Sequence, residues 1–349
     1  MFNVVSFNER FYFVSRKVRM QQEFVVMPDK REREESGKRY WTITRKRYLA
    51  AWLFMLPALV LLAVFTFYPL VYGVILAFFE NNLIREPRFV GVDNFVKAFQ
   101  DGDFWLAMLH SALYLLIVPL IQIAAISMAL LVNQKLKGVV FFRSLFYLPV
   151  ITSLVVAAVV WKWMYAPDYG LINSGIRWFS ETVQQVSIRR FKGPGWLTDP
   201  TLALGSIAFV TFWKGIGYYM VIYLAGLQAV PKELEEAGKL DGAKGWSMAR
   251  YIIIPLLMPT VALCTIMSTI AALRVFDEVL VMSGGAQGNP NKSTLVASTY
   301  IYGRAFGSIS GQFEFGYAAA LSLILAAFIW VFTLINLKFF SKGGLEYYS

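Results

Sequence analysis

Charged side chains within long apolar stretches are the residues of this sequence whose types and positions suggest chemistry. Lys214 lies next to Trp213 in one such stretch. Arg274 lies in a second stretch, just before the acidic pair Asp277 and Glu278. A Lys or Arg at the centre of a bilayer costs about 2.5–3.5 kcal/mol on insertion scales, and such residues usually face a bundle interior or a watery cavity. These side chains predict a polar interior within the membrane.

Two interpretations of these charges are open. In one, the two cations have a structural role: they snorkel toward the membrane interface, or Lys214 and Arg274 neutralise the two carboxylates as internal ion pairs. In the other, the residues line a substrate passage, where aromatic rings stack on sugar rings and cations donate hydrogen bonds. The candidate substrate-binding residues of this passage are Trp213, Lys214, Tyr218, Arg274 and, in another apolar stretch, Gln122.

Residues suited to catalysis or metal binding are scarce. Cys264 is the one cysteine, which excludes an intramolecular disulfide and a cysteine zinc cluster. His110 is the one histidine and opens an apolar stretch, so we expect a structural role for it. We therefore expect no catalytic residue and no metal site. A membrane-bound enzyme is disfavoured, because it would need paired carboxylates or a histidine cluster facing one cavity.

The composition indicates a membrane protein. Hydrophobic residues make up 57% of the chain and charged residues 16%, which is low for a soluble domain. The net charge of +11 does not indicate a nucleic-acid partner, because 12 of the 33 Lys and Arg residues precede residue 48. They flank the first apolar stretch, where basic residues are expected beside a membrane.

Six apolar stretches must position the charged residues, and each can cross the roughly 30 Å hydrocarbon core as a helix of about 20 residues. Backbone groups in lipid must be satisfied within their segment, which favours helices, and the alternation of a β-barrel is absent. The sequence therefore predicts an all-α membrane protein with six transmembrane helices. The stretches are Leu49–Phe79, Trp105–Val132, Phe141–Tyr165, Leu202–Ala229, Ile253–Met282 and Gly316–Phe340.

The distribution of Lys and Arg predicts the orientation. With both termini in the cytosol, the inner segments hold 21 Lys and Arg residues and the outer loops hold 10. An excess of basic residues marks the cytosolic side. This orientation places the polar run between the fourth and fifth stretches in the cytosol.

That polar run, residues 231–255, has features of a helix that binds another protein. Helix formers dominate residues 232–240, and Pro231 is tolerated at the start of a helix. Gly242 and Gly245 then end the turn, and a second short helix is expected up to Pro255. The small residues Ala237, Gly238 and Gly242 would let a partner's surface approach the backbone.

The spacing within the run is specific. Glu236-Ala237-Gly238 is followed after three residues by Gly242, after nine more by Ile252, and then by Ile254-Pro255. The run resembles the EAA loop of the membrane subunits of bacterial ABC importers, with departures at Gly238 and Ile254. The resemblance implies that this loop couples the chain to an ATPase. The residues implied in coupling are Glu236, Ala237, Gly238, Asp241 and Gly242.

The resemblance extends over about residues 45–340 and is closest to the larger permease subunit of oligosaccharide and glycerol-phosphate importers. By this resemblance, Trp213, Tyr218 and Arg274 fall where the maltose-type permease holds its sugar. The further segments that carry it include Phe89-Val-Gly91-Val-Asp93-Asn94-Phe95, Leu148-Pro149, Tyr169-Gly170-Leu-Ile-Asn173, Phe276-Asp277 and Tyr300-Ile-Tyr302.

The resemblance implies a type I ABC importer permease fold in the bacterial inner membrane. The implied partners are a second homologous permease subunit, a cytosolic ABC ATPase dimer and a periplasmic or extracellular solute-binding protein, with no nucleic acid. The chain itself is expected to hold no cofactor, because ATP and Mg²⁺ would bind the ATPase subunits. Four segments are predicted: a cytosolic tail (1–47), a first helix and outer loop (48–100), a permease core (101–340) that contains the coupling loop 231–255, and a C-terminal cytosolic tail (341–349).

The implied substrate is a sugar or an oligosaccharide. Arg274, and the outer cluster of Arg189, Arg190 and Lys192, would favour an acidic sugar such as a uronate (alginate) oligomer or a sugar phosphate. One alternative is therefore a glycerol-3-phosphate-type ABC permease. A further, less favoured alternative is a secondary transporter that works without ATP, for which the pair Asp277 and Glu278 is the best support.

Overall fold

The structure, a computed structural model, describes residues 30–82, 84–134, 138–184 and 193–343. Its chain divides into two compact units, Met1–Leu70 and Val71–Ser349. The cluster Arg189, Arg190 and Lys192 lies outside the described residues. The first unit contains α2 (Lys30–Leu62), the π-helical turn η1 (Ala63–Phe67) and the start of α3 (Tyr68–Leu76). Part of the predicted cytosolic tail, from Lys30 onward, is thus helical.

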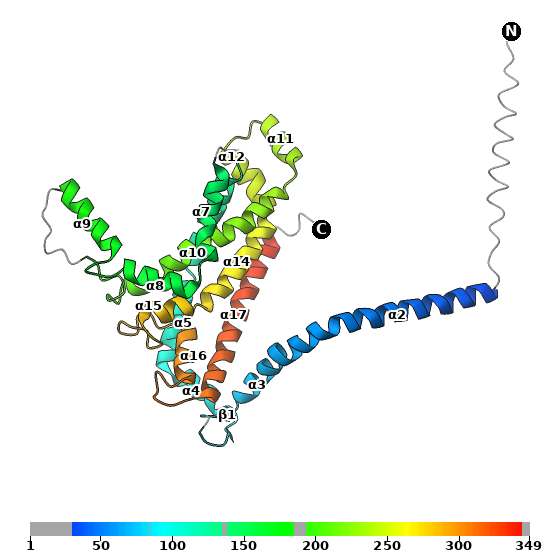
Figure 1. Ribbon diagram of the computed structural model, residues 1–349, viewed down its shortest axis with the longest axis horizontal. Helices are drawn as coiled ribbons and strands as arrows, with labels where there is room; N and C mark the ends of the chain where they lie inside the picture. Colours follow the sequence, from blue (N-terminus) through cyan, green and yellow to red (C-terminus); the bar gives the residue numbers. More distant parts are fainter. Residues whose placement is uncertain (1–29, 83, 135–137, 185–192, 344–349) are drawn as a thin grey trace, which may run out of the picture. The chain divides into compact units, whose positions relative to one another are not determined.

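The second unit is almost entirely helical, as Figure 1 shows. Its one sheet among the described residues pairs β1 (Phe79–Glu80) with β2 (Arg88–Phe89) in antiparallel register. The helices are α4 (Asp93–Gln100), α5 (Gly102–Tyr114), α6 (Ile117–Val132), α7 (Val139–Ile151), α8 (Leu154–Met164), α9 (Leu171–Gln184), α10 (Ala203–Gln228), α11 (Lys232–Leu240), α12 (Trp246–Met248), η2 (Ala249–Ile253), α13 (Ile254–Leu256), α14 (Met258–Leu273), α15 (Asp277–Ser283), α16 (Ala297–Ala305) and α17 (Phe315–Gly343).

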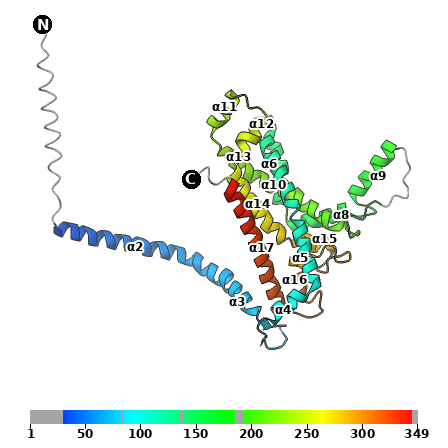
Figure 2. The ribbon, with the colours of Figure 1, turned by 180° about the vertical axis from the view of Figure 1, so that it is seen from behind.

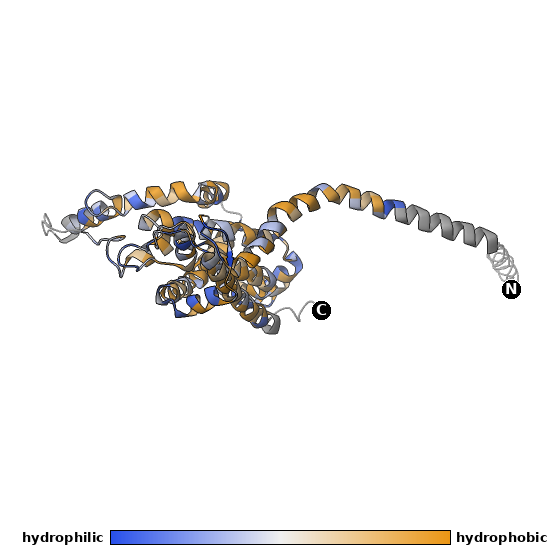
Figure 3. Cartoon of the chain, turned by 90° about the horizontal axis from the view of Figure 1, so that it is seen from below, coloured by the Kyte–Doolittle hydropathy of each residue, from blue (hydrophilic) through white to orange (hydrophobic). Residues whose placement is uncertain are grey.

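Five described helical stretches are long and apolar enough to cross a membrane, and a bent pair makes a sixth. The five are Lys46–Leu76, Gly102–Val132, Ala203–Gln228, Met258–Ser283 and Phe315–Phe340. In Figure 3, hydrophobic residues, drawn in orange, recur along the helices. The prediction of a membrane protein with six helical spans is therefore confirmed in number when the bent pair is counted as one span.

The third predicted stretch is not one helix. It forms α7 and α8, which meet at an angle of 98°. Thr152 and Ser153 at the junction have extended backbone angles, with ψ of 135° at both residues. Pro149 lies in the last turn of α7 and has no amide hydrogen to donate, which weakens the helix before the bend. The predicted stretch over residues 141–165 is therefore helical but bent at this junction.

The fifth predicted stretch is also interrupted. α14 ends at Leu273, and α15 begins at Asp277 after three residues that are not helical. Phe276, just before α15, has a φ of −143° and a ψ of −64°, which no α-helix adopts. The apolar composition predicted the length of the span but gave no sign of this break.

Much of the buried core of the second unit forms around α10. This helix packs against α6, α7, α14 and α15. Met220 and Tyr223 are fully buried in this packing. α11 lies at the opposite end of the unit from α4 and α16 in both Figure 1 and Figure 2.

A charged cluster holds the α4 and α16 end of the unit together. Asp101 caps α5, where its Oδ1 accepts the amide hydrogen of Phe104 at 3.2 Å. Its Oδ2 accepts hydrogen bonds from the hydroxyls of Tyr300 (2.5 Å) and Tyr317 (2.6 Å). The same oxygen lies 3.2 Å from Nη2 of Arg304. One carboxylate thereby joins α5, α16 and α17.

Candidate functional site

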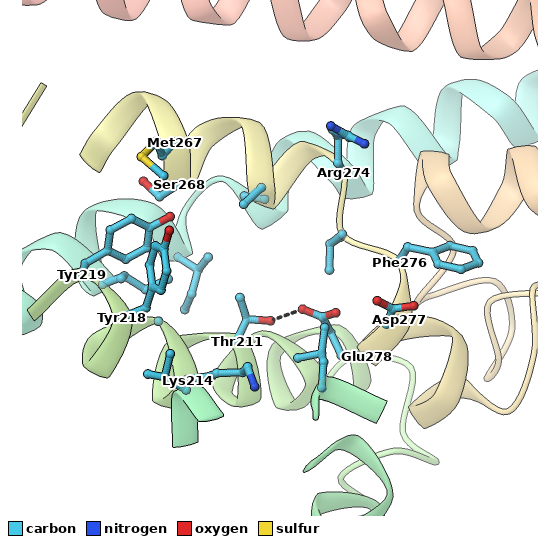
Figure 4. A pocket seen from close by; sticks show the side chains of 18 residues that line it. Thr211, Lys214, Tyr218, Tyr219, Met267, Ser268, Arg274, Phe276, Asp277 and Glu278 are labelled. Atoms are coloured by element: carbon cyan, nitrogen blue, oxygen red, sulfur yellow. Dashed lines mark hydrogen bonds between the residues drawn. The ribbon is translucent and has the colours of Figure 1, made fainter. Parts of the chain in front are cut away.

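A cavity of about 530 Å³ lies within the second unit, beside the two helix breaks. Its walls come from α6, α7, α8, α10, α14 and the start of α15, and Figure 4 shows the side chains that line it. Apolar residues such as Ile121 and Val150 form much of the wall, with a few polar groups between them. A mostly apolar cavity with a few convergent polar groups is the usual form of a small-molecule site.

Lys214 lines this cavity from α10, and its ammonium group is held by backbone carbonyls. Nζ donates to the carbonyl oxygen of Pro149 at 3.0 Å and also to that of Thr152. Both carbonyls lie at the end of α7, where the bend removes their usual amide partners. Lys214 therefore supplies hydrogen-bond donors to the bend, and one of its three ammonium hydrogens is left for the cavity.

Glu278 lines the cavity from the first turn of α15. Only 6% of its surface is exposed, and Oε1 accepts a hydrogen bond from Thr211 Oγ1 at 2.8 Å. Thr211 is in turn 2.7 Å from the hydroxyl of Tyr114. Because Thr211 uses its one hydrogen on Glu278, Tyr114 must be the donor in the second contact. The result is a directed chain from Tyr114 through Thr211 to the carboxylate.

Arg274 and Asp277 line the cavity at the break between α14 and α15, and both are exposed. Figure 4 shows the Arg274 guanidinium directed away from the carboxylate of Glu278. Among the described residues, no salt bridge within 4.0 Å joins Lys214 or Arg274 to either carboxylate. Lys214 and Arg274 thus form no direct ion pair with these carboxylates, and backbone carbonyls at the α7 break hold the Lys214 ammonium group instead.

The other predicted substrate-binding residues lie in different surroundings. Tyr218 lines the cavity and is 41% exposed, with its ring edge-on to that of Tyr219. Trp213 is not among the cavity residues, and its ring packs edge-on against Trp161 at 5.4 Å. The structure thus brings Lys214, Tyr218 and Arg274 together and places Trp213 elsewhere.

Gln122 is buried behind the cavity wall in a closed hydrogen-bond network. Its side chain donates to Ser268 Oγ at 2.8 Å and to the Cys264 carbonyl at 3.3 Å, and it accepts from the Tyr223 hydroxyl at 2.5 Å. All of these groups are buried, so the amide has a structural partner at each end.

Sequence reasoning missed three polar cavity residues, Thr211, Tyr219 and Ser268. The sequence did contain a signal for Thr211. Thr211, Lys214 and Tyr218 are spaced by three and four residues, which places them on one face of a helix. Ser268 gave no such signal, because its approach to the cavity depends on how α14 packs against α10.

The predicted coupling loop forms a helix followed by a glycine-capped turn. α11 spans the predicted residues 232–240, and Gly242 has a φ of +85°. The amide of Ala243 donates to the Gly238 carbonyl at 2.8 Å, and that of Gly242 donates to the Lys239 carbonyl at 3.1 Å. These two bonds form a Schellman cap, in which a left-handed residue ends the helix. Gly242 serves this turn.

Gly238 has an internal role that differs from the predicted one. It is buried, and a methyl group at this position would overlap the side chain of Ile252 and crowd Met248. Its small size therefore lets α11 pack against the following η2 segment, and it does not expose backbone to a partner. Glu236, Ala237 and Asp241 are exposed, so they remain available for contact with another protein.

Proteins with similar sequences match most of the chain. The sequence model of the family described as "Binding-protein-dependent transport system inner membrane component" matches residues 46–340. The lactose transport system permease protein LacF of Rhizobium radiobacter is 33% identical over 303 residues, 86% of this chain and 95% of LacF. The trehalose/maltose transport system permease protein MalF of Thermococcus litoralis is 29% identical over 289 residues, 82% of this chain and 92% of MalF.

The fold also matches a solved structure. A chain from a bacterial ABC transporter involved in the import of the acidic polysaccharide alginate aligns with a TM-score of 0.72 at 23% sequence identity. The alignment covers 87% of this chain and 99% of the other. At this identity, the match establishes the type of fold.

Proposed function

We propose a function from one premise: the chain belongs to the family of binding-protein-dependent transport system inner membrane components. It is a multi-pass permease subunit of the inner membrane, in the fold of ABC importer permeases. Its partners are a binding protein, a second permease subunit and an ABC ATPase.

The proposed substrate is a sugar or an oligosaccharide. The relatives LacF and MalF are named for lactose and for trehalose and maltose, and the similarity spans more than four-fifths of this chain in each case. The cavity supports the same class of substrate. It offers an aromatic ring at Tyr218 and hydrogen-bonding groups at Ser268 and Glu278, which suit a molecule rich in hydroxyl groups.

The proposed site residues on this chain are Tyr218, Lys214 and Arg274, with Glu278 added from the structure. Trp213 and Gln122 support the site indirectly, through packing and hydrogen bonds behind its walls. We propose no catalytic residue, no metal and no cofactor for this chain. ATP and Mg²⁺ are assigned to the ATPase subunits, which supply the energy for transport.

The coupling loop carries the mechanism of the proposal. Residues 232–248 dock on a cytosolic ATPase dimer, with Glu236, Ala237 and Asp241 at the contact and Gly238 and Gly242 shaping the loop. ATP binding closes the dimer and displaces α11 as a rigid body. The spans then alternate between inward-open and outward-open arrangements around the cavity. Both chain termini lie in the cytosol, as the Lys and Arg distribution predicts.

The single observation that carries the proposal is that α10, which lines the cavity, leads within three residues into α11. A motor acting on α11 would therefore act on a wall of the cavity.

The test is uptake by the complete transporter in sealed vesicles. Binding protein is supplied with a labelled neutral disaccharide, a uronate oligomer or a sugar phosphate, and uptake is measured with and without ATP. We expect ATP-dependent uptake of one sugar class, and a several-fold rise in the half-saturating concentration for Tyr218→Ala. Uptake without ATP, or by this chain alone, would refute the proposal.

A further inference from the structure

One face of α10 contacts both broken helices of the second unit. Thr211 and Lys214 are three positions apart, so their side chains leave the helix on the same side. Lys214 reaches the end of α7 through the carbonyls of Pro149 (3.0 Å) and Thr152. Thr211 reaches the start of α15 through the carboxylate of Glu278 (2.8 Å). Figure 4 shows these two side chains on neighbouring turns of one helix.

The first contact replaces amide partners that the break after α7 removes, and the second supplies a donor to a buried carboxylate at the start of α15. At the bend after α7, the last carbonyls have no amide partner, and unsatisfied backbone groups are strongly unfavourable in a membrane. The positive charge of Lys214 also suits the negative end of a helix dipole. At the second break, buried Glu278 needs a donor, and Thr211 provides one.

The helices that follow the two breaks also contact each other, and α10 connects this region to α11. α8, which follows the first break, packs against α15, which follows the second. α10 is unbroken from Ala203 to Gln228, and α11 begins at Lys232. Close packing holds α10 against α7, since a methyl group at Gly217 would overlap the Phe146 carbonyl. A displacement of α11 therefore has one continuous helix through which to reach both breaks.

We propose that Thr211 and Lys214 are positioning residues that make the two broken helices move together with α10 during transport. Lys214 holds the α7–α8 bend and Thr211 holds the start of α15, so the cavity walls respond as one unit to the coupling loop. This inference rests on the proposed function, because it assigns the path by which that function's motor reaches the cavity.

The first test compares matched substitutions in the complete transporter in vesicles. Lys214→Met and Thr211→Val keep the approximate size and remove the donated hydrogen bonds, whereas Lys214→Arg and Thr211→Ser retain a donor. We expect sugar uptake per ATP hydrolysed to fall at least tenfold in the first pair and to recover to at least half in the second. ATP hydrolysis is measured in parallel for all four variants, so that uptake is expressed per ATP hydrolysed. Normal coupling in both Lys214→Met and Thr211→Val would overturn the proposal.

The second test separates positioning from sugar contact. Cys264, the one native cysteine, is fully buried, so Val150→Cys adds a single accessible thiol on the α7 wall of the cavity. Its labelling rate should change several-fold when ATP and vanadate trap the motor, and this change should vanish with Lys214→Met. If the rate still changes in that variant while uptake is lost, Lys214 contacts the sugar and the proposal is wrong, although the proposed function stands. Absence of ATP-dependent uptake in the unmodified transporter would instead refute the proposed function.

Discussion

Lys214 Nζ lies 3.0 Å from the carbonyl oxygen of Pro149, a residue in another helix and 65 positions away in sequence. The ammonium group of Lys214, a charge within an apolar stretch, therefore donates its hydrogen bonds to backbone carbonyls and not to a carboxylate. Helix breaks in a membrane leave polar groups that side chains must satisfy. A partly buried lysine within a predicted span can thus indicate a broken helix nearby as well as a ligand site.

Gly217 is predicted to be intolerant of any side chain. A methyl group there would overlap the carbonyl of Phe146 and push α10 away from α7. Overpacking of this kind typically costs about 1–3 kcal/mol. We expect Gly217→Ala to lower the thermal unfolding midpoint of the purified complex. Gly205→Ala on the same helix is the matched control, because its added methyl meets no atom within 4 Å.

Gly242 is predicted to matter through its backbone conformation. Its φ of +85° is rarely adopted by other residues, and a left-handed conformation costs them roughly 1–2 kcal/mol. No atom lies near the position of an added Cβ, so Gly242→Ala isolates this conformational effect. We expect weakened ATPase binding in pull-down experiments for Gly242→Ala and loss of uptake for Gly242→Leu, although the chain still inserts into the membrane.

The control for this prediction is Gly175→Ala in α9, where a helical glycine faces open space. That substitution should leave uptake unchanged. Normal ATPase binding and uptake in Gly242→Leu would show that the Schellman turn does not shape the coupling surface.

Asp101 is predicted to make stability depend on acid pH. Burial raises the pKa of Asp101, but hydrogen bonds from Tyr300, Tyr317, the Phe104 amide and Arg304 outweigh this effect and lower it below its usual value near 3.8. A carboxyl with a lowered folded pKa stabilises the fold above its unfolded pKa, and this contribution is lost as pH falls through the folded value.

We therefore expect Asp101→Asn to have its whole destabilising effect at pH 7. The difference in unfolding midpoint between wild type and variant should narrow below about pH 4. Thermal unfolding of wild type and variant across this range measures the gap. A gap of constant size from pH 7 to pH 3 would contradict the assignment of the ionised form.

Gln122 is predicted to act in stability and not in sugar recognition. Gln122→Leu would remove the acceptor of the buried Tyr223 hydroxyl and one donor to Ser268 Oγ, and an unsatisfied buried group costs about 1–3 kcal/mol. We expect a lower unfolding midpoint with an unchanged half-saturating sugar concentration. A double variant with Tyr223→Phe should lose less than the sum of the two single effects, because the two residues share one bond.

The lengths of the apolar stretches and the EAA-like spacing predicted most of the fold. The bounds of α10 and α11 agree with the expected ones within a residue, because continuous apolar runs and a glycine stop are local signals. The breaks at Thr152 and at Arg274–Phe276 were missed. Each lies within an apolar run, and each is stabilised by a residue distant in sequence, which no local pattern shows.

The candidate site was predicted only in part for the same reason. Lys214, Tyr218 and Arg274 reach the cavity, and their polarity in apolar surroundings made them visible. Trp213 has the aromatic character of a sugar-stacking residue, but its angular position on α10 directs it toward Trp161. The sequence gives the type of each residue, whereas the side of α10 that faces the cavity depends on how this helix packs against its neighbours.

The contact between Gly238 and Ile252 has a consequence for how the predicted coupling loop would meet a partner. The loop is folded upon its own chain, and its exposed face, including Leu240 at 90% exposure, is already arranged. Association then needs little loss of chain freedom, so more of the contact energy remains as affinity. A loop that is already folded can dissociate from its partner and bind it again in each transport cycle without refolding.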